Sequence, residues 1–523
     1  MPNPKVAQGK VRKWARSILV ILVPILFIPG CILESKLPSQ PVDVNHSDVI
    51  DSIYPSGVTP SRTVNLYQPL LDTHLSIGEA SAPQVYPGVN VKEKSTGMIV
   101  KYRLTRQRFG TWDKTLEFKW NYFLLQSNFL FPESLPDTSG MAVLTKNLYD
   151  SIHIRDRFTK YFDSASAPSI LNVINTSTKG GAIGISIKLP LHKDTLVINQ
   201  VVKGSPADKA GLKMGMGILE VNDSNVVGDS AIERFKRFSA GDSGVEIRLK
   251  LKTQNGEWII SMIRVPVSFP TVLVDSLSNR VGYISISGFT PQTLGVNSTY
   301  TEFRDALLAT KRFPITLLDL RDNGGGSLDI AIRMCDEILP AGAVIIRQRQ
   351  RRFDENLHAV LNSEITSIAT SGGVGEMSPT GGKRKYLLLA NDHSASASEI
   401  LLVSVIEGAK APLMGIKTFG KGVGQTVRNT PGNGLALVTF LKFTSASGLD
   451  YHTIGLIPDY LDSASGDSLL INATLRAEAL LWKPPAKSSS ELQARSELTE
   501  RAALIEWNRR EALLGKPWRV EFP

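Results

Sequence analysis

Apolar and polar residues are arranged in the C-terminal half of this chain as strands and helices of a layered domain would be. Four stretches rich in Ile, Leu and Val predict strands, namely residues 280–287, 315–320, 386–390 and 434–444. Residues 327–339 have amphipathic spacing, and residues 400–406 are apolar on nearly every face, as in a helix sunk in a core. Short apolar strands that alternate with helices are typical of a sheet covered by helices. The pattern therefore predicts an α/β core over residues 269–483.

The N-terminal half shows weaker periodicity. Residues 32–95 are rich in Pro, Ser, Thr and Val, which predicts a linker or tether with some local β structure. Residues 98–119 mix polar and apolar positions as strands do, whereas residues 118–125 and 141–162 predict helices. We therefore expect a mostly helical region over residues 96–172. At the other end, a Pro- and Ser-rich linker leads into one charged helix, which predicts a helical tail over residues 484–523.

Charge and composition narrow the class of protein. Of the 523 residues, 21% are charged and 42% are apolar, which is ordinary for globular proteins and allows three or four domains. Half of the net charge of +10 comes from five basic residues at the N-terminus: Lys5, Lys10, Arg12, Lys13 and Arg16. Because no basic stripe with interleaved aromatic residues is present elsewhere, nucleic-acid binding is not indicated.

The basic N-terminus leads into an apolar run at residues 18–30, followed by Cys31. The run is too short for a spanning helix, which needs about 20 residues, and it contains two prolines. Residues 1–31 resemble a bacterial lipoprotein signal peptide, which implies that Cys31 becomes the lipidated first residue. An ordinary secretory signal with an incidental cysteine is the alternative. Since residue 32 is not acidic, the resemblance implies an outer-membrane lipoprotein that faces the periplasm or the cell surface.

The positions of the cysteines and histidines in the sequence do not indicate a metal site or redox chemistry. Cys335 is the only other cysteine and lies in the amphipathic stretch, which predicts a small buried residue. The seven histidines have no metal-ligand spacing. The sequence therefore predicts neither a metal nor another cofactor.

The candidate catalytic residues lie between residues 391 and 425. Ser394, Ser396 and Ser398 alternate with alanines at a predicted strand-to-helix turn, and Lys421 and Gln425 follow. A serine hydroxyl needs a neighbouring base, and a lysine can be that base only where burial disfavours its charged form. The apolar residues 400–406 supply such burial.

These residues resemble the S41 peptidases, the C-terminal processing or tail-specific proteases. The resemblance implies that Ser396 is the nucleophile, that Lys421 is the base and that Gln425 orients the lysine. It also implies a catalytic domain of the crotonase-like (ClpP/crotonase) type over residues 269–483. The alternative is that the three serines have no catalytic role and are only small residues in a tight turn.

A glycine-rich turn at residues 321–326 follows the strand at 315–320 and precedes the amphipathic stretch. A strand, a glycine turn and a helix start together expose backbone N–H groups, which acyl transfer needs for the oxyanion. The resemblance implies that one donor is a glycine among residues 324–326, with Gly325 favoured, and that the other is the amide of Ala397. A phosphate-binding loop is the rival interpretation, but no Gly-Lys-Ser/Thr follows.

Residues 173–268 resemble a PDZ domain. The match rests on residues 181–187 and 197–212, and it implies a carboxylate-binding loop formed by Gly181, Ala182, Ile183, Gly184 and Ile185. Such a loop holds a peptide's C-terminal carboxylate while a strand edge pairs with the peptide. Residues 214–217 depart from the usual turn, and a PDZ-shaped module that binds nothing is the alternative.

Together these features predict a serine endopeptidase of the cell envelope that cleaves protein or peptide substrates with free C-termini and is held at the membrane by a lipid anchor. The alternative from another class is a catalytically inactive, PDZ-containing, peptide-binding lipoprotein. A coenzyme-dependent acyltransferase or lyase on the related crotonase-like fold lacks a coenzyme-binding motif.

Overall fold

The computed structural model describes residues 31–33, 45–55, 57–139, 141–153, 155–188, 195–228, 230–294, 297–370, 373–376, 383–464 and 466–481. The predicted signal peptide before Cys31 and the predicted tail over residues 484–523 lie outside the described residues. Among the described helices, none is long and apolar enough to cross a membrane.

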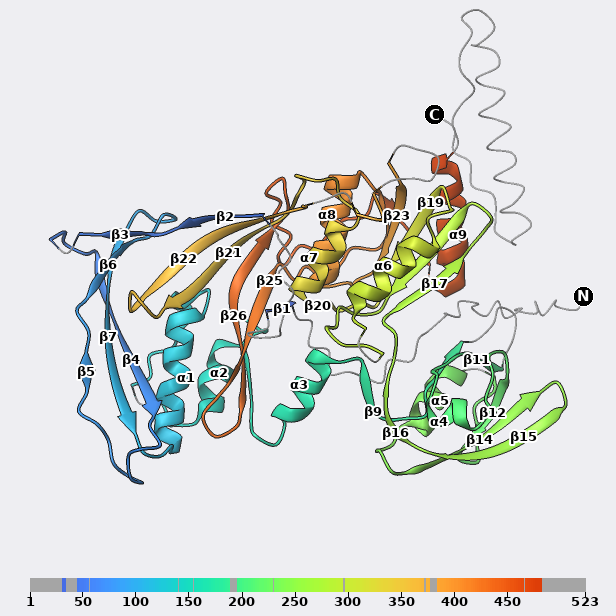
Figure 1. Ribbon diagram of the computed structural model, residues 1–523, viewed down its shortest axis with the longest axis horizontal. Coiled ribbons are helices and arrows are strands. Elements are labelled where there is room, and N and C mark those ends of the chain that lie inside the picture. The colour runs from blue at the N-terminus through green and yellow to red at the C-terminus, as the bar shows by residue number, and fades with distance from the viewer. Residues whose placement is uncertain are drawn as a thin grey trace, which may run out of the picture. The chain divides into compact units, whose positions relative to one another are not determined.

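The C-terminal half contains a six-stranded, mostly parallel sheet (Figure 1). Its first strand, β17, is antiparallel to its neighbour, and the others run parallel. Every residue of β19 is buried, as expected for a parallel strand that is covered on both faces. In order across the sheet, the strands are β17 (Val272–Ser276), β18 (Val281–Ile286), β19 (Ile315–Asp319), β23 (Lys385–Ala390), β24 (Leu413–Gly415) and β27 (Tyr460–Leu461).

Helices pack on this sheet through one large apolar core. They are α6 (Thr299–Ala309), α7 (Leu328–Asp336) and α8 (Ala397–Ala409). A further helix, α9 (Gly466–Leu481), follows the last strand of the sheet in the chain. α6, α7 and α8 contribute to the same core as β18, β19 and β23, which confirms the predicted helix-covered sheet. Cys335 lies fully buried in that core, as expected, and burial raises the pKa of its thiol to about 12.

A second, eight-stranded sheet carries the residues that face the nucleophile helix. Its order is β2–β22–β21–β26–β25–β1–β20, and β8 pairs with β26. The short β1 pairs in parallel with both β20 and β25. The strands are β1 (Cys31–Leu33), β2 (Asn45–Ile50), β8 (Lys160–Phe162), β20 (Gly326–Ser327), β21 (Val344–Asp354), β22 (Ala359–Ile368), β25 (Val423–Asn429) and β26 (Leu435–Thr444).

The predicted tether is largely wrong, because residues 52–92 contribute strands to a third sheet. This five-stranded sheet has the order β3–β6–β7–β4, with β5 on β7. Its strands are β3 (Ser52–Tyr54), β4 (Arg62–Leu71), β5 (Gln84–Val85), β6 (Val89–Lys92) and β7 (Ile99–Phe109). Leu66 and Val91 are buried in it together with Phe123 of the adjoining helix. Long-range pairing, which local periodicity does not reveal, turns this Pro-rich stretch into a sheet.

The region over residues 96–172 is mixed and not mostly helical. Its helical elements are α1 (Lys114–Asn128), η1 (Pro132–Ser134), α2 (Thr145–Ile152) and α3 (Ala167–Asn175). The helix expected at residues 118–125 is present in α1, but the one expected over residues 141–162 ends at Ile152. The chain then turns and enters β8, because pairing with β26 outweighs the helical pattern there.

The predicted PDZ region forms its own apolar core around a five-strand path, β10–β11–β12–β14–β15, with β13 on β12. A separate pair, β9–β16, lies at its ends. The elements are β9 (Thr178–Ala182), β10 (Ile185–Lys188), β11 (Leu196–Val201), α4 (Pro206–Lys209), β12 (Gly217–Val221), β13 (Ser224–Asn225), α5 (Ala231–Ser239), β14 (Glu246–Thr253), β15 (Gly256–Ile263) and β16 (Val265–Ser268).

Candidate functional site

Ser396 occupies a strained turn between a strand and a helix. β23 ends at Ala390, and α8 begins at Ala397, so Ser396 is the residue immediately before the helix. Its backbone has φ 62° and ψ −115°, a conformation that a residue with a side chain rarely adopts. Strain of this kind is typical of turns that expose a nucleophile at the start of a helix.

The three alternating serines differ in what their hydroxyl groups do. Ser394 Oγ donates to the carbonyl of Leu320 at 2.8 Å, and Ser398 Oγ donates to that of Asn323 at 2.8 Å. Ser396 Oγ is buried and has no hydrogen-bond partner among the described residues. Two of the serines therefore hold the glycine-rich turn against α8, and Ser396 alone keeps a hydroxyl that can react.

Lys421 lies fully buried beside this turn. Its Nζ donates to Oε1 of Gln425 at 2.7 Å, and Nε2 of Gln425 donates to Oγ1 of Thr439 at 2.8 Å. The Thr439 contact fixes which end of the Gln425 amide faces the amine. The pairing of Lys421 with Gln425 that the sequence predicted is thus present.

Glu399 joins the serine turn to the lysine loop. One oxygen, Oε2, accepts the backbone N–H of Ser396 at 2.9 Å and that of Lys421 at 2.7 Å. The other, Oε1, accepts Thr418 Oγ1 at 2.6 Å and the N–H of Gly420 at 2.7 Å. Burial raises the pKa of Glu399, and the four hydrogen bonds oppose this rise. Since all four partners are donors, the geometry requires an ionised carboxylate, which places Ser396 and Lys421 side by side.

The glycine-rich turn lies directly against the nucleophile. Gly325 has φ 102°, and a Cβ on it would lie 2.9 Å from Cβ of Ser396 and 3.0 Å from N of Ala397, so a side chain does not fit. Ala397 is the first residue of α8, where an N–H has no intrahelical acceptor. Gly325 differs from the prediction, because its N–H donates to Oδ1 of Asn323 at 2.9 Å. The Asn323 side chain, which the sequence did not single out, therefore occupies this N–H group.

Asp319 and Arg321 hold the same turn from below. The Arg321 guanidinium donates to both carboxylate oxygens of the buried Asp319. Tyr283 Oη also donates to Oδ2 of Asp319, at 2.7 Å. This buried network supports the interpretation of both residues as structural.

In the PDZ region, the predicted loop is shaped by its backbone. Gly184 has φ 84°, and a Cβ there would lie 2.2 Å from Cβ of Ser205. The carbonyl oxygen of Gly184 accepts the N–H of Val202 at 2.8 Å. The carbonyl oxygen of Ile183 accepts the N–H of Ala207 at 2.9 Å. Ile183 and Ile185 bury their side chains in the domain core, and Gly181 and Ala182 belong to β9.

β10, which starts at Ile185, is an edge strand of the PDZ sheet within the described part of the chain. The unusual turn at residues 214–217 keeps its place through backbone bonds between Gly215 and Ile198 and between Ile198 and Met216, while Met214 is exposed. The departure from the usual sequence therefore changes the surface of this turn more than its path.

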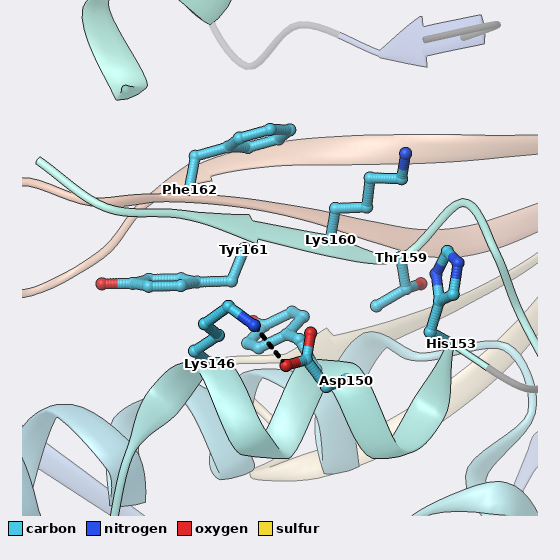
Figure 2. Close-up of a pocket in the computed structure, with 8 residues that line it drawn as sticks. Lys146, Asp150, His153, Thr159, Lys160, Tyr161 and Phe162 are labelled. Atoms are coloured by element: carbon cyan, nitrogen blue, oxygen red, sulfur yellow. Dashed lines mark hydrogen bonds and ion pairs between the residues drawn. The ribbon is translucent and has the colours of Figure 1, made fainter. Parts of the chain in front are cut away.

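A pocket of about 220 Å³ lies apart from these residues, between α2 and β8 (Figure 2). Lys146 and Asp150 form an ion pair of 2.5 Å on α2, and Lys160, Tyr161 and Phe162 come from β8. None of the predicted catalytic residues lines this pocket.

The family model of peptidase family S41 matches residues 280–461, and that of the PDZ domain matches residues 173–251. The chain therefore carries a peptidase S41 domain and a PDZ domain. The S41 match contains Gly325, Ser396, Ala397, Lys421 and Gln425, and the PDZ match contains the predicted carboxylate loop at residues 181–185.

Relatives of this chain are described as serine proteases. A probable CtpA-like serine protease of Staphylococcus aureus is 26% identical over 370 residues, which are 69% of this chain and 68% of the relative. A protein of Staphylococcus epidermidis with the same description is 27% identical over 320 residues, 60% of each chain. A photosystem II D1 C-terminal processing protease of known structure covers 68% of this chain and 94% of its own, at 19% identity and a TM-score of 0.40. The chain is a serine-type peptidase with a PDZ domain.

Proposed function

We propose that this peptidase is an endopeptidase that works with a Ser396–Lys421 dyad on a crotonase-like core. Two observations carry the proposal: the buried Ser396 hydroxyl has no hydrogen-bond partner among the described residues, and the buried Lys421 amine donates to Gln425. Both residues are tied through their backbone N–H groups to a single oxygen of Glu399.

In the proposed reaction, neutral Lys421 takes the proton of Ser396 Oγ as the oxygen attacks the peptide carbonyl. The tetrahedral oxyanion accepts a hydrogen bond from the N–H of Ala397. It accepts a second one from the N–H of Gly325, after that group has left Oδ1 of Asn323. Lys421 then gives the proton to the leaving amine, and the acyl-enzyme forms. Water repeats the sequence on the ester and releases the new C-terminus. Gln425 touches only the amine, so its part is to orient Lys421.

The placement of β1 supports binding of the substrate as an extended strand. In β1, Cys31 is the register partner of both Gly326 and Gly424, and Ile32 is that of Ser327 and Gln425. These partners include Gln425 and the end of the glycine-rich turn. We infer that a substrate takes the position that residues 31–33 hold here, since strand addition supplies backbone hydrogen bonds to any sequence.

We further propose that the chain is a lipoprotein of the cell envelope, anchored through Cys31 in the outer membrane and facing the periplasm or the cell surface. Cleavage before Cys31 and acylation would draw residues 31–33 to the membrane and free the strand position beside Gln425. Cys31→Ser should release the protein from the membrane fraction. Retention of the variant at the wild-type level, after cleavage at the same bond, would contradict the anchor.

The PDZ domain is proposed to select substrates by their free C-termini, with the loop at residues 181–185 as the carboxylate site and β10 as the pairing edge. Amidating the C-terminus of a peptide removes the charge and should weaken cleavage by about 1.5–3 kcal/mol, roughly the range for hydrogen bonds to charged groups. Equal cleavage of the acid and amide forms would show that the loop does not recognise the carboxylate.

The test of the dyad uses Ser396→Ala, Lys421→Ala and the double variant, with dye-labelled casein as substrate. Each single change should abolish hydrolysis, and the double variant should be little worse, because members of one catalytic unit are strongly non-additive. Lys421→Arg should also fail, since a guanidinium remains protonated. Gln425→Ala should lose less activity, because it removes orientation and not the base.

Ser394→Ala and Ser398→Ala are the matched controls and should keep most of the activity. If one of them is inactive while Ser396→Ala hydrolyses casein, the nucleophile is wrong. If all three variants are as active as the wild type, the serine mechanism is wrong. If the wild type itself binds peptides but shows no hydrolysis, the chain is the inactive binding protein.

A further inference from the structure

The turn between α2 and β8 brings an aromatic residue from the N-terminal region to the amine of Lys421. Asp156, which is buried, accepts the N–H of Phe158 at 3.0 Å and Oγ1 of Thr159 at 2.5 Å. Figure 2 shows Thr159 at the point where this turn enters β8, above α2. The carboxylate of Asp156 thus fixes the turn and with it the direction of the Phe158 side chain.

Phe158 lies on the lysine base itself. Nζ of Lys421 is 4.6 Å from the centre of the Phe158 ring. The ring is buried in a small apolar cluster with Leu130 and with Val423, two residues after the lysine. Phe419, two residues before the lysine, meets the same ring at 6.4 Å between centroids. The aromatic ring therefore closes the lysine site from a segment distant in sequence.

A second link joins the same turn to the lysine. Thr159 Oγ1 accepts the N–H of Thr439 at 3.0 Å, and Thr439 Oγ1 in turn accepts Nε2 of Gln425. Gln425 accepts Nζ of Lys421. Two adjacent residues of one turn thus reach the base, one through an aromatic ring and one through a chain of hydrogen bonds.

We propose that Phe158 is a positioning residue of the active site, which covers the Lys421 amine, excludes water from it and keeps it neutral for proton transfer from Ser396. The proposal rests on the proposed Ser–Lys mechanism. It makes the turn at residues 155–159 a part of the active site, although the S41 match begins only at residue 280.

Two effects of the ring oppose each other. An aromatic face attracts an ammonium group, which raises the pKa of a lysine by on the order of one unit. Loss of water around a buried ammonium group lowers the pKa by up to roughly 3–5 units. Because Lys421 is fully buried, we expect the removal of water to be the larger effect.

The charged groups around the ring act in both directions. The guanidinium carbon of Arg157 lies 5.0 Å from the centre of the Phe158 ring and 4.5 Å from that of Phe419, so a second cation borders the site. His452 faces the same ring at 6.4 Å between centroids. Glu399 is bonded to the backbone of Lys421, and Asp156 is engaged by its own turn. Arg157 disfavours a charged amine, whereas the two carboxylates favour it.

The test compares Phe158→Ala, which lets water in, with Phe158→Leu, which keeps an apolar cover but removes the aromatic face. The readout is the pH dependence of kcat/KM for peptide hydrolysis by the full chain. For Phe158→Ala, the midpoint of the acid limb should move upward by about one pH unit or more. For Phe158→Leu, it should stay or move downward. Phe131→Leu, a change in the same apolar cluster, should leave the midpoint in place.

A loss of kcat/KM by the same factor at every pH, with an unmoved midpoint in Phe158→Ala, would mean that Phe158 serves only to pack the core. If Phe158→Ala does not fold, Phe158→Val gives a smaller opening, for which a smaller upward shift is expected. An unmoved midpoint in that variant would also overturn the proposal.

A second measurement separates this proposal from the mechanism on which it rests. In a Ser396→Ala background with ε-¹³C-labelled lysine, the NMR resonance of Lys421 is assigned by its loss in Lys421→Arg. Its titration midpoint should rise when Phe158 becomes Ala, whether or not the enzyme turns over. A shifted midpoint without hydrolysis in the Ser396 enzyme would sink the mechanism and keep the role of Phe158. Hydrolysis with an unshifted midpoint would support the mechanism and overturn the role of Phe158.

Discussion

The candidate active site and the predicted PDZ loop both present backbone N–H groups at the start of a short turn or helix, yet the acceptors of these groups differ in burial. Around Ser396, the N–H groups of Ser396, Gly420 and Lys421 all donate to the buried carboxylate of Glu399. In the PDZ region, the half-buried Asp208 accepts the N–H of Gly204 at 2.8 Å, in an exposed hydrogen bond. The proposed ligand of the neighbouring loop is a carboxylate that comes from outside.

The difference shows what burial does to a backbone donor. A donor that is closed off from water must have a permanent acceptor, so the catalytic region carries its own carboxylate. A backbone N–H group at a domain edge can donate to water and exchange that water for a ligand. The fixed geometry of the peptidase core and the proposed ligand binding of the PDZ domain are both consistent with this rule.

The largest effect is expected when the internal carboxylate is removed. Glu399→Gln leaves one acceptor oxygen for four donors, so about two buried donors lose their partner. At roughly 1–3 kcal/mol each, the free energy of unfolding should fall by about 2–6 kcal/mol. Because the link between Ser396 and Lys421 is broken, kcat/KM should fall by on the order of 100-fold. Urea unfolding and casein hydrolysis measure the two effects.

Glu407 on the same helix is the matched control. It accepts Oγ of Ser445 and both Oγ and N of Ser447, but it is only half-buried. Burial would raise the pKa of Glu407, but the hydrogen bonds from these serines outweigh it and lower the pKa. Glu407→Gln should cost about 1 kcal/mol or less and leave hydrolysis within a few-fold, since water replaces the lost acceptor. Equal losses in both variants would show that depth does not matter.

The sequence predicted the part of the site that local spacing encodes. Ser396 at a strand-to-helix turn follows from residues close in sequence, and the pairing of Lys421 with Gln425 follows from the resemblance to S41 peptidases; the structure has both. The role of Glu399 was only partly visible, as a first-turn carboxylate of the helix. Its bonds to Thr418, Gly420 and Lys421 join segments about 20 residues apart, which no periodicity encodes.

The same limit explains the wrong predictions for the fold. The strands of the core were predicted because a parallel strand buried on both faces is apolar throughout, as in β19 and β23. Strands were expected over residues 98–119, and β7 lies there. The strands within the predicted tether were largely missed, because β3 pairs with β6, and β4 in parallel with β7, across about 40 residues. Phe158 was missed for a related reason, since it meets Lys421 across more than 260 residues.

The PDZ side of the comparison is sharpened by two glycines with similar backbones. Gly184 and Gly204 have φ 84° and 78°, but a Cβ on Gly184 would lie 2.2 Å from Cβ of Ser205, whereas Gly204 has nothing within 4 Å. Gly204→Ala should therefore cost only the left-handed strain, about 1–2 kcal/mol. Gly184→Ala adds overpacking of about 1–3 kcal/mol and should also displace the proposed carboxylate loop.

Thermal unfolding and the binding of a C-terminal peptide check this pair of variants. We expect Gly184→Ala to lose stability and affinity, and Gly204→Ala to lose some stability but little affinity. Hydrolysis of a short peptide that cannot span both domains should be unchanged in either variant. If both alanines weaken peptide binding equally, the close approach at Gly184 is not what shapes the loop.

The smallest expected effect concerns the pH dependence of stability near the lysine loop. Nδ1 of His452 accepts the N–H of Gly422 at 3.3 Å, which requires an unprotonated nitrogen. Burial, reinforced by Lys442, lowers the pKa of His452 below its ordinary 6.5. The unfolded chain then takes up this proton at a higher pH than the folded chain does. The contribution of His452 to stability is therefore fully present above pH 6.5 and is lost as the pH falls through the lowered pKa.

Urea unfolding at pH 7.5 and at pH 5 should show this loss in the wild type, with a slope of at most about 1.4 kcal/mol per pH unit from a single proton. His452→Asn keeps an acceptor for Gly422 but cannot titrate, so its stability should change less over the same interval. His74→Asn, at an exposed histidine, should retain the wild-type slope. If His452→Asn and the wild type lose stability in parallel, His452 does not cause the loss. Protonation of other groups then governs the fall in the free energy of unfolding at low pH.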